Sequence, residues 1–293
     1  MCDIAASMDG FFAYINERHR IYLRKQRGDP WPWTTDPILQ TYRFTNVYRP
    51  LDRVTVDYRR LVAGRYCNSW EKSRAAELLA ETVAFRLFNW PATYRRLKPV
   101  RGSRWDGDKA KRILRGYQDA GEKIVTGAYI VSNLGSKRPK IELLCEAITA
   151  AHEMAPGLIK MIRANRTLQN ATAVIAEHVP MCAAFSAYEV VSDLRWTPLL
   201  NKAPDIMFWA NPGPGAVRGL NRIHGRSLNA GLSDWQANEE MADLLKESQR
   251  PGRLGKHMMP LEMRDVEHSL CELDKYLRVK GGEGRLRSKY CRP

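Results

Sequence analysis

Apolar residues recur at helical spacing in several parts of this chain, and this periodicity constrains the fold more than any other feature. Phe12, Ile15, His19 and Tyr22 follow a three-four-three spacing that places them on one side of a helix. The same kind of evidence predicts further helices over about 71–89, 140–152, 156–165, 170–178, 184–194, 233–248 and 261–277. Residues 124–132 are rich in β-branched side chains and fit either a short strand or a buried helical turn. The sequence therefore predicts a mainly α-helical protein.

No internal repeat and no low-complexity linker divides the chain, so we expect residues 1–293 to form a single helical domain. Ser233 and Gln236 form a predicted capping box at the start of one helix. Residues 98–123 are charged and glycine-rich, which favours a loop with a short helix. The tail over 278–293 holds six Lys or Arg, and we expect it to stay extended on DNA or in solvent.

The chain is strongly basic, with 47 Lys and Arg against 32 Asp and Glu and a net charge of +15. Such an excess favours polyanionic partners, above all nucleic acid, although a solvated basic surface without a partner is the alternative. The six cysteines form no CxxC pair and no histidine has a metal-ligand spacing, so we expect no metal and no cofactor. No stretch is apolar enough to span a membrane, which indicates a cytoplasmic protein.

The stretch over about 170–195 predicts two helices joined by a tight turn, the layout of a helix-hairpin-helix. In that motif the turn presents backbone N–H groups to a DNA phosphate. The predicted phosphate-binding turn consists of Val179, Pro180, Met181, Cys182 and Ala183. The stretch resembles the hairpin of helix-hairpin-helix DNA glycosylases, whose turn reads Leu-Pro-Gly-x-Gly, but Met181 and Ala183 stand where the glycines belong. We interpret Cys182 as a packed apolar residue rather than a nucleophile.

Asp205 is the predicted catalytic residue. In the glycosylase superfamily an aspartate follows the turn by a little over twenty residues, and Asp205 lies close to that place. Phe185 stands where lyase-type members carry a lysine, so the resemblance implies chemistry without a Schiff base. The alternative is that Asp205 only caps a helix, and both roles are compatible.

A wider resemblance covers nearly the whole chain. Its segments are FFAYINERHRIYLRKQRG, DPILQTYRFTNVYRPLDRVT, FRLFNWP, ANPGPGAVRGLNR and DVEHSLCELDKY. Together they resemble the helical proteins of phage thymine hypermodification, known as α-glutamyl/putrescinyl thymine pyrophosphorylases, amino acid:DNA transferases or the 5-hydroxymethyluracil DNA kinase helical domain.

This resemblance implies an enzyme that transfers an amine or amino acid onto phosphorylated 5-hydroxymethyluracil in double-stranded DNA, with loss of phosphate or pyrophosphate. It also implies an amine co-substrate, a 5-hydroxymethyluracil DNA kinase as partner, and action in the bacterial host cytoplasm. No GxxxxGK[ST] loop occurs, which disfavours a kinase. Two alternatives stay open: a DNA glycosylase that excises a modified base in phage defence, and a noncatalytic DNA-binding module.

Chemistry on a base requires the base to be flipped out of the duplex, stacked and clamped by phosphate contacts. The predicted substrate-binding residues are Arg43, Asn46, Arg49, Arg53, Trp209 and Asn211. Each has a structural alternative: ion pairs or a solvated face for the arginines, a turn role for Asn46, and core packing for Trp209. The NPGPGA segment over 211–216 fits either an anion-binding nest or a loop that leads into a helix. For His268, a surface or hydrogen-bonded role is favoured over proton transfer.

Overall fold

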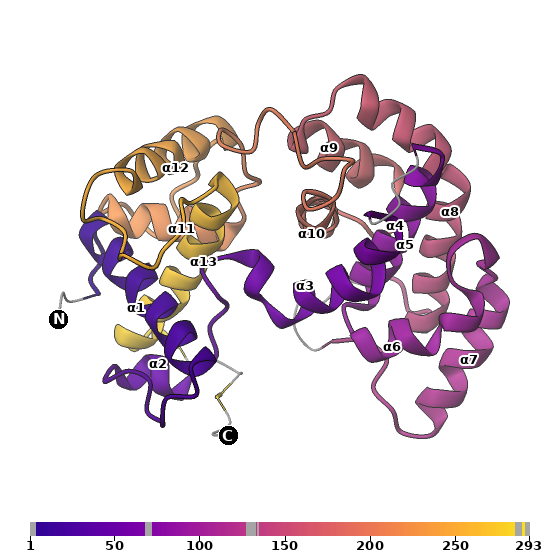
Figure 1. Ribbon diagram of the computed structural model, residues 1–293, viewed down its shortest axis with the longest axis horizontal. Coiled ribbons are helices and arrows are strands. Elements are labelled where there is room, and N and C mark those ends of the chain that lie inside the picture. The colour runs from indigo at the N-terminus through magenta and orange to yellow at the C-terminus, as the bar shows by residue number, and fades with distance from the viewer. Residues whose placement is uncertain (1–3, 68–71, 127–132, 134, 285–288, 291–293) are drawn as a thin grey trace. The chain divides into compact units, whose positions relative to one another are not determined.

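The computed structural model describes residues 4–67, 72–126, 133, 135–284 and 289–290, and its secondary structure is helical (Figure 1). Within these residues the only β element is an isolated antiparallel bridge between Tyr42 and Lys289, so the mainly α prediction is confirmed. The chain divides into two compact units. Unit 1 consists of Met1–Asp52 and Ile206–Pro293, and unit 2 of Arg53–Asp205. That the two act as a single domain stays a prediction.

Unit 1 is built around its last helix. Its helices are α1 (Met8–Gln26), α2 (Pro37–Thr41), α11 (Pro214–Ile223), α12 (Asp234–Ser248) and α13 (Met263–Lys280), with a 3-10 turn over Arg49–Leu51. Helices α11 and α13 pack closely because α11 presents glycines: a Cβ on Gly219 would lie 2.6 Å from the Leu270 carbonyl oxygen. A Cβ on Gly215 would lie 2.9 Å from Cys271 Sγ. The capping box of Ser233 and Gln236 at the start of α12 is confirmed.

The described part of the basic tail packs against unit 1. The ring of Tyr290 stacks on Trp31, with centroids 5.6 Å apart and planes 4° apart. The Tyr290 N–H donates to the Thr41 carbonyl oxygen at 2.8 Å. The expectation of a tail extended on DNA or in solvent is therefore wrong at this position, because an aromatic side chain gains more by stacking than by facing water.

Unit 2 surrounds one buried helix, α5 (Ala75–Phe88), on which every residue but two is buried. Before it come α3 (Arg53–Tyr58), a π-helical turn η2 (Arg59–Ala63), α4 (Gly64–Cys67) and the 3-10 turn η3 (Lys72–Arg74). After it come α6 (Pro91–Arg96), two 3-10 turns (Lys98–Val100 and Gly102–Arg104), α7 (Gly107–Asp119), α8 (Lys140–Ala164), α9 (Leu168–His178) and α10 (Ala184–Leu194). Helix α8 packs on α5, and α9 packs on both α8 and α10.

The helix around Pro156 differs from the sequence-based prediction. Residues 140–164 form a single helix, whereas two helices were predicted over about 140–152 and 156–165, the second beginning at Pro156. Pro156 is exposed, so its ring points to solvent, while Ala155, Leu158 and Ile159 beside it are buried. Burial of these flanking residues offsets the hydrogen bond that the proline removes. Most of the 124–132 segment, whose strand or turn assignment was left open, lies outside the described residues.

Candidate functional site

Two segments that the sequence singled out meet inside unit 1. The backbone N–H of Thr45 donates to Glu272 Oε2 at 3.0 Å, and the Thr45 hydroxyl lies 2.6 Å from His268 Nε2. Both partners belong to α13, more than 220 residues away in the chain. His268 is buried and hydrogen-bonded, as the sequence favoured. Residues 43–52 and 265–276 therefore form one polar cluster.

The side-chain amide of Asn46 is engaged within this cluster. Its Oδ1 accepts from the Arg18 guanidinium at 3.0 Å, and its Nδ2 donates to the Leu51 carbonyl oxygen at 2.9 Å. The Asn46 backbone N–H donates to Asp52 Oδ1 at 3.0 Å. These contacts give Asn46 the turn role weighed above. The side chain keeps a second acceptor site on Oδ1 and a second N–H on Nδ2, so these contacts orient the amide without using all of its hydrogen-bonding capacity.

The three predicted phosphate-binding arginines lie in different environments. Arg49 is only 3% exposed, and its guanidinium lies 3.6 Å from the Asp52 carboxylate. Burial raises the pKa of that carboxyl, and the Arg49 charge partly opposes the shift. Arg43 and Arg53 are exposed. The surface position needed for phosphate contact therefore exists for Arg43 and Arg53, whereas Arg49 packs inside unit 1.

Trp209 and Asn211 are half-buried in the segment that leads into α11. Helix α11 begins at Pro214 with Gly213 as its N-cap, and a Cβ on Gly213 would lie 3.7 Å from Glu267 Oε1. A carboxylate thus already lies beside the positive end of this helix, where a bound anion would otherwise interact. For residues 211–216, this geometry favours a loop that leads into α11 over an anion-binding nest.

In unit 2, α9 and α10 lie on either side of residues 179–183, so the predicted turn between two helices exists, while its role as a helix-hairpin-helix stays a prediction. Met181 has φ +62°, so this methionine adopts the left-handed conformation for which related turns use glycine. The Cys182 N–H donates to the Val179 carbonyl oxygen at 3.1 Å and closes the turn. Cys182 is 1% exposed, and burial raises its pKa to about 12, which keeps the thiol protonated and unreactive.

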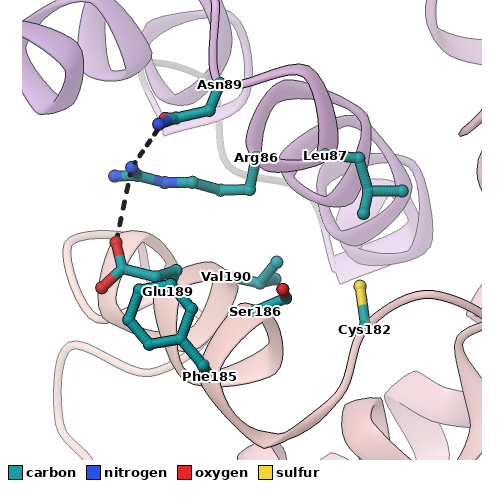
Figure 2. A pocket seen from close by; sticks show the side chains of 8 residues that line it. All are labelled: Arg86, Leu87, Asn89, Cys182, Phe185, Ser186, Glu189 and Val190. Carbon is teal, nitrogen blue, oxygen red and sulfur yellow. Dashed lines mark hydrogen bonds and ion pairs between the residues drawn. The ribbon is translucent and has the colours of Figure 1, made fainter. Parts of the chain in front are cut away.

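A buried ionic cluster supports the hairpin from α5. The Arg86 Nε and Nη2 atoms each donate to the Asp193 carboxylate at 2.6 Å, and Nη1 donates to Asn89 Oδ1 at 3.2 Å. Figure 2 shows Glu189 on the other side of the guanidinium, at 3.6 Å, with Phe185 beside it in the lining of a small pocket. Because its guanidinium is occupied by internal partners, Arg86 orients α10 against α5.

Asp205 caps a helix distant from it in sequence. Its two carboxylate oxygens accept from the backbone N–H groups of Leu168 at 2.8 Å and Gln169 at 3.0 Å, in the first turn of α9. The Thr167 hydroxyl accepts the next N–H, from Asn170, at 3.0 Å. A carboxylate there also interacts favourably with the helix dipole. The capping alternative is thus realised, although on α9 rather than on a helix that Asp205 begins; a catalytic role for it stays a prediction.

No candidate metal cluster of three or more His, Cys, Asp or Glu exists in the part of the chain that the structure describes. None of the described helices is long and apolar enough to cross a membrane.

The described residues form helices with one isolated bridge, and the chain carries a net charge of +15, a balance that favours polyanionic partners such as nucleic acid. Residues 5–285 match the family described as "5-hmdU DNA kinase, helical domain", and the chain belongs to this family. A protein of Bacillus phage SP10 named 5-hmdU DNA kinase is 30% identical over 291 residues, covering 92% of this chain and 44% of the relative. The chain thus spans less than half the length of this relative. No solved structure matches it.

These relationships correct the functional prediction. Family and relative are both named for a kinase, so the expected amine or amino-acid transfer is wrong, and the glycosylase alternative has no support. The missing GxxxxGK[ST] loop was a misleading criterion, because kinases also bind nucleotide phosphates through other glycine-rich loops. The motifs identified a helical scaffold, and a scaffold does not specify the reaction.

Proposed function

We propose that this chain takes part in the phosphorylation of 5-hydroxymethyluracil in DNA and binds the DNA substrate in that reaction. The observation that carries the proposal is the family match over residues 5–285, supported by the phage SP10 relative. In the reaction, the oxygen of the 5-hydroxymethyl group attacks the terminal phosphorus of a nucleoside triphosphate. The hydroxyl proton is released and the nucleoside diphosphate leaves.

The surface charge supports the DNA-binding part of this proposal. The net charge of +15 favours association with the DNA backbone through counterion release. The 5-hydroxymethyl group of a paired base projects into the major groove, and flipping or local unpairing of the base would allow its oxygen to be placed in line with the phosphoryl donor. Arg43 and Arg53, which are exposed, remain proposed phosphate contacts, and half-buried Trp209 and Asn211 remain proposed base contacts.

We also propose that the hairpin between α9 and α10 binds a DNA phosphate, as in a helix-hairpin-helix. Pro180 and Ala183 are exposed, and the N-cap residue Ala183 supplies no side-chain acceptor to the first turn of α10. The N–H groups of that turn and the positive end of the helix dipole both favour an anion there. The φ of +62° at Met181 supports this proposal because it gives the turn its glycine-like geometry.

The test uses the full chain with ATP, Mg²⁺ and a duplex that holds a single 5-hydroxymethyluracil; the same duplex with thymine is the control. After digestion to nucleosides, mass analysis should show a phosphomonoester on the hydroxymethyl group of the first duplex alone. Ala183→Glu provides the hairpin variant, because a glutamate there would stabilise α10 through its dipole but repel a phosphate. It should weaken binding of both duplexes without loss of helicity. Unphosphorylated hydroxymethyluracil would contradict the kinase assignment, and unchanged binding by Ala183→Glu would contradict the hairpin assignment.

A further inference from the structure

An open groove on unit 2 has chemistry that the proposals above do not use. It is lined by residues of α3, the π-helical turn η2 and α4, and by Trp196, which lies just after α10. The residues that give the groove its character are Val56, Arg59, Arg60, Gly64 and Trp196. Val56 is 45% exposed, so an apolar side chain here also faces solvent.

The groove carries positive charge that internal partners do not neutralise. Arg59 and Arg60 are both exposed, and among the described residues neither lies within ion-pair distance of a carboxylate. Asp57 is the only acidic residue between positions 53 and 67, and it pairs with Arg95 at 2.9 Å. No carboxylate of the described residues lines the groove. Two adjacent guanidiniums are therefore free to bind phosphate oxygens, which they can do in a bidentate manner.

The local backbone brings both arginines to the groove. The Gly64 N–H donates to the Arg59 carbonyl oxygen, five residues earlier, as in a π-helix. A Cβ on Gly64 would lie 3.1 Å from that oxygen, so glycine suits this wide turn. Single π-turns are rarer and less favourable than α-helical turns, and they occur frequently at functional sites.

Trp196 adds an aromatic surface to the lining of the groove. Trp196 is half-buried, and the Arg195 guanidinium carbon lies 4.6 Å from its ring centroid, within cation–π range. A base can stack on such a ring whatever its identity, since every base has a π-face. Arginines along a groove with an aromatic ring beside them are the arrangement by which proteins bind single strands.

We propose that this groove binds a short single-stranded DNA segment, with phosphates at Arg59 and Arg60 and one base stacked on Trp196. A duplex fits this chemistry less well because its bases are already stacked on one another. A nucleoside triphosphate also fits less well, because none of the described lining residues is a carboxylate that could hold its Mg²⁺. The inference extends the proposed function to unpaired DNA beside the modified base, but it needs neither the hydroxymethyl group nor ATP.

The experiment measures binding of a fluorescent oligothymidine to the full chain by anisotropy at several salt concentrations, without ATP. Arg59→Gln combined with Arg60→Gln should weaken binding about tenfold or more, and should reduce the slope of log K against log salt by about 1.4, or ~0.7 per phosphate contact. The control combines Arg112→Gln with Lys109→Gln, two changes on α7 outside the groove that remove the same charge. It should change the affinity less than about twofold.

Trp196 is tested separately with an oligonucleotide that lacks bases. Trp196→Leu should weaken oligothymidine binding by roughly five- to a hundredfold, whereas Trp196→Phe keeps most of the affinity. On the abasic strand of equal length, Trp196→Leu and the unsubstituted chain should bind alike. An unchanged salt slope in the arginine variant, an equal loss in the α7 control, or an equal loss on the abasic strand would each overturn the proposal. Because the probe contains only thymine, these outcomes are independent of whether hydroxymethyluracil is phosphorylated.

Discussion

Asp265 should make the stability of this protein depend on pH in a direction opposite to that of an ordinary surface carboxylate. It lies in the first turn of α13 and is 6% exposed. Its Oδ2 accepts from the Glu262 N–H at 3.0 Å. Burial raises its pKa from 3.8 to about 7, while hydrogen bonds from the backbone of Glu262 and Arg49 oppose the shift.

The sign and magnitude follow from linkage. The folded protein holds this proton up to about pH 7, whereas the unfolded chain releases it near pH 4. The contribution of this carboxyl to the free energy of unfolding is therefore fully present below about pH 4. It is lost as the pH rises from about 4 to about 7. The difference between 3.8 and about 7 corresponds to ~4 kcal/mol in total, of which about 2–3 kcal/mol falls between about pH 5 and about pH 8.

Asp265→Asn removes the ionisation and keeps a side-chain oxygen that can accept from Glu262. A hydrogen bond changed by the substitution affects the free energy of unfolding equally at about pH 5 and about pH 8. The part of the stability difference that changes with pH therefore reports the ionisation of the Asp265 carboxyl alone. Urea unfolding should show the variant gaining about 2–3 kcal/mol relative to the unsubstituted chain when the pH is raised from about 5 to about 8. Hydrogen exchange of the α13 amides would locate the effect in unit 1. An identical stability difference at both values would refute the argument that burial controls this carboxyl.

Two further substitutions test packing and capping. Gly219→Ala should destabilise unit 1 by ~1–3 kcal/mol, because the new Cβ would meet the backbone of α13 at 2.6 Å. The matched control is Gly116→Ala on α7, whose new Cβ would have no atom within 4 Å, and it should stabilise the protein by ~0.5–1 kcal/mol. Thermal unfolding would measure both effects. Equal effects of the two substitutions would contradict the packing argument. Asp205→Ala should cost ~0.5–2 kcal/mol and speed hydrogen exchange in the first turn of α9. Unchanged exchange there would show that the cap contributes nothing.

Local patterns in the sequence predicted the helices well because the signals for a helix lie within it. The apolar stripe of α1 and the capping box of α12 are formed by residues a few positions apart. Helix α10 occupies 184–194, the range expected from its own sequence. Pro156 was misjudged because burial of α8 around it, which depends on other helices, decides whether a proline ends the helix.

The contacts of the candidate site were less predictable because they join distant parts of the chain. Asn46 and Arg49 were predicted as substrate ligands with a turn role and an ion pair as their alternatives. Arg18 and Asp52 engage them, and only the folded chain brings Arg18 near. Asp205 was predicted as the catalytic residue with helix capping as the alternative, and the helix that it caps begins 37 positions earlier. A sequence motif therefore identified important residues without giving their partners.

The reaction was misassigned for a related physical reason. A DNA kinase and a DNA transferase that act on successive forms of one base share the same needs: positive charge for the backbone, surfaces that stack an unpaired base, and helices that hold both. The two reactions differ only in the few groups that contact the 5-substituent and the phosphoryl donor. Long motifs such as DVEHSLCELDKY mainly specify the scaffold: in α13, Leu270 packs on α11 and His268 holds the Thr45 hydroxyl. Residues that build a scaffold identify its family, and the chemistry must be measured on the base itself.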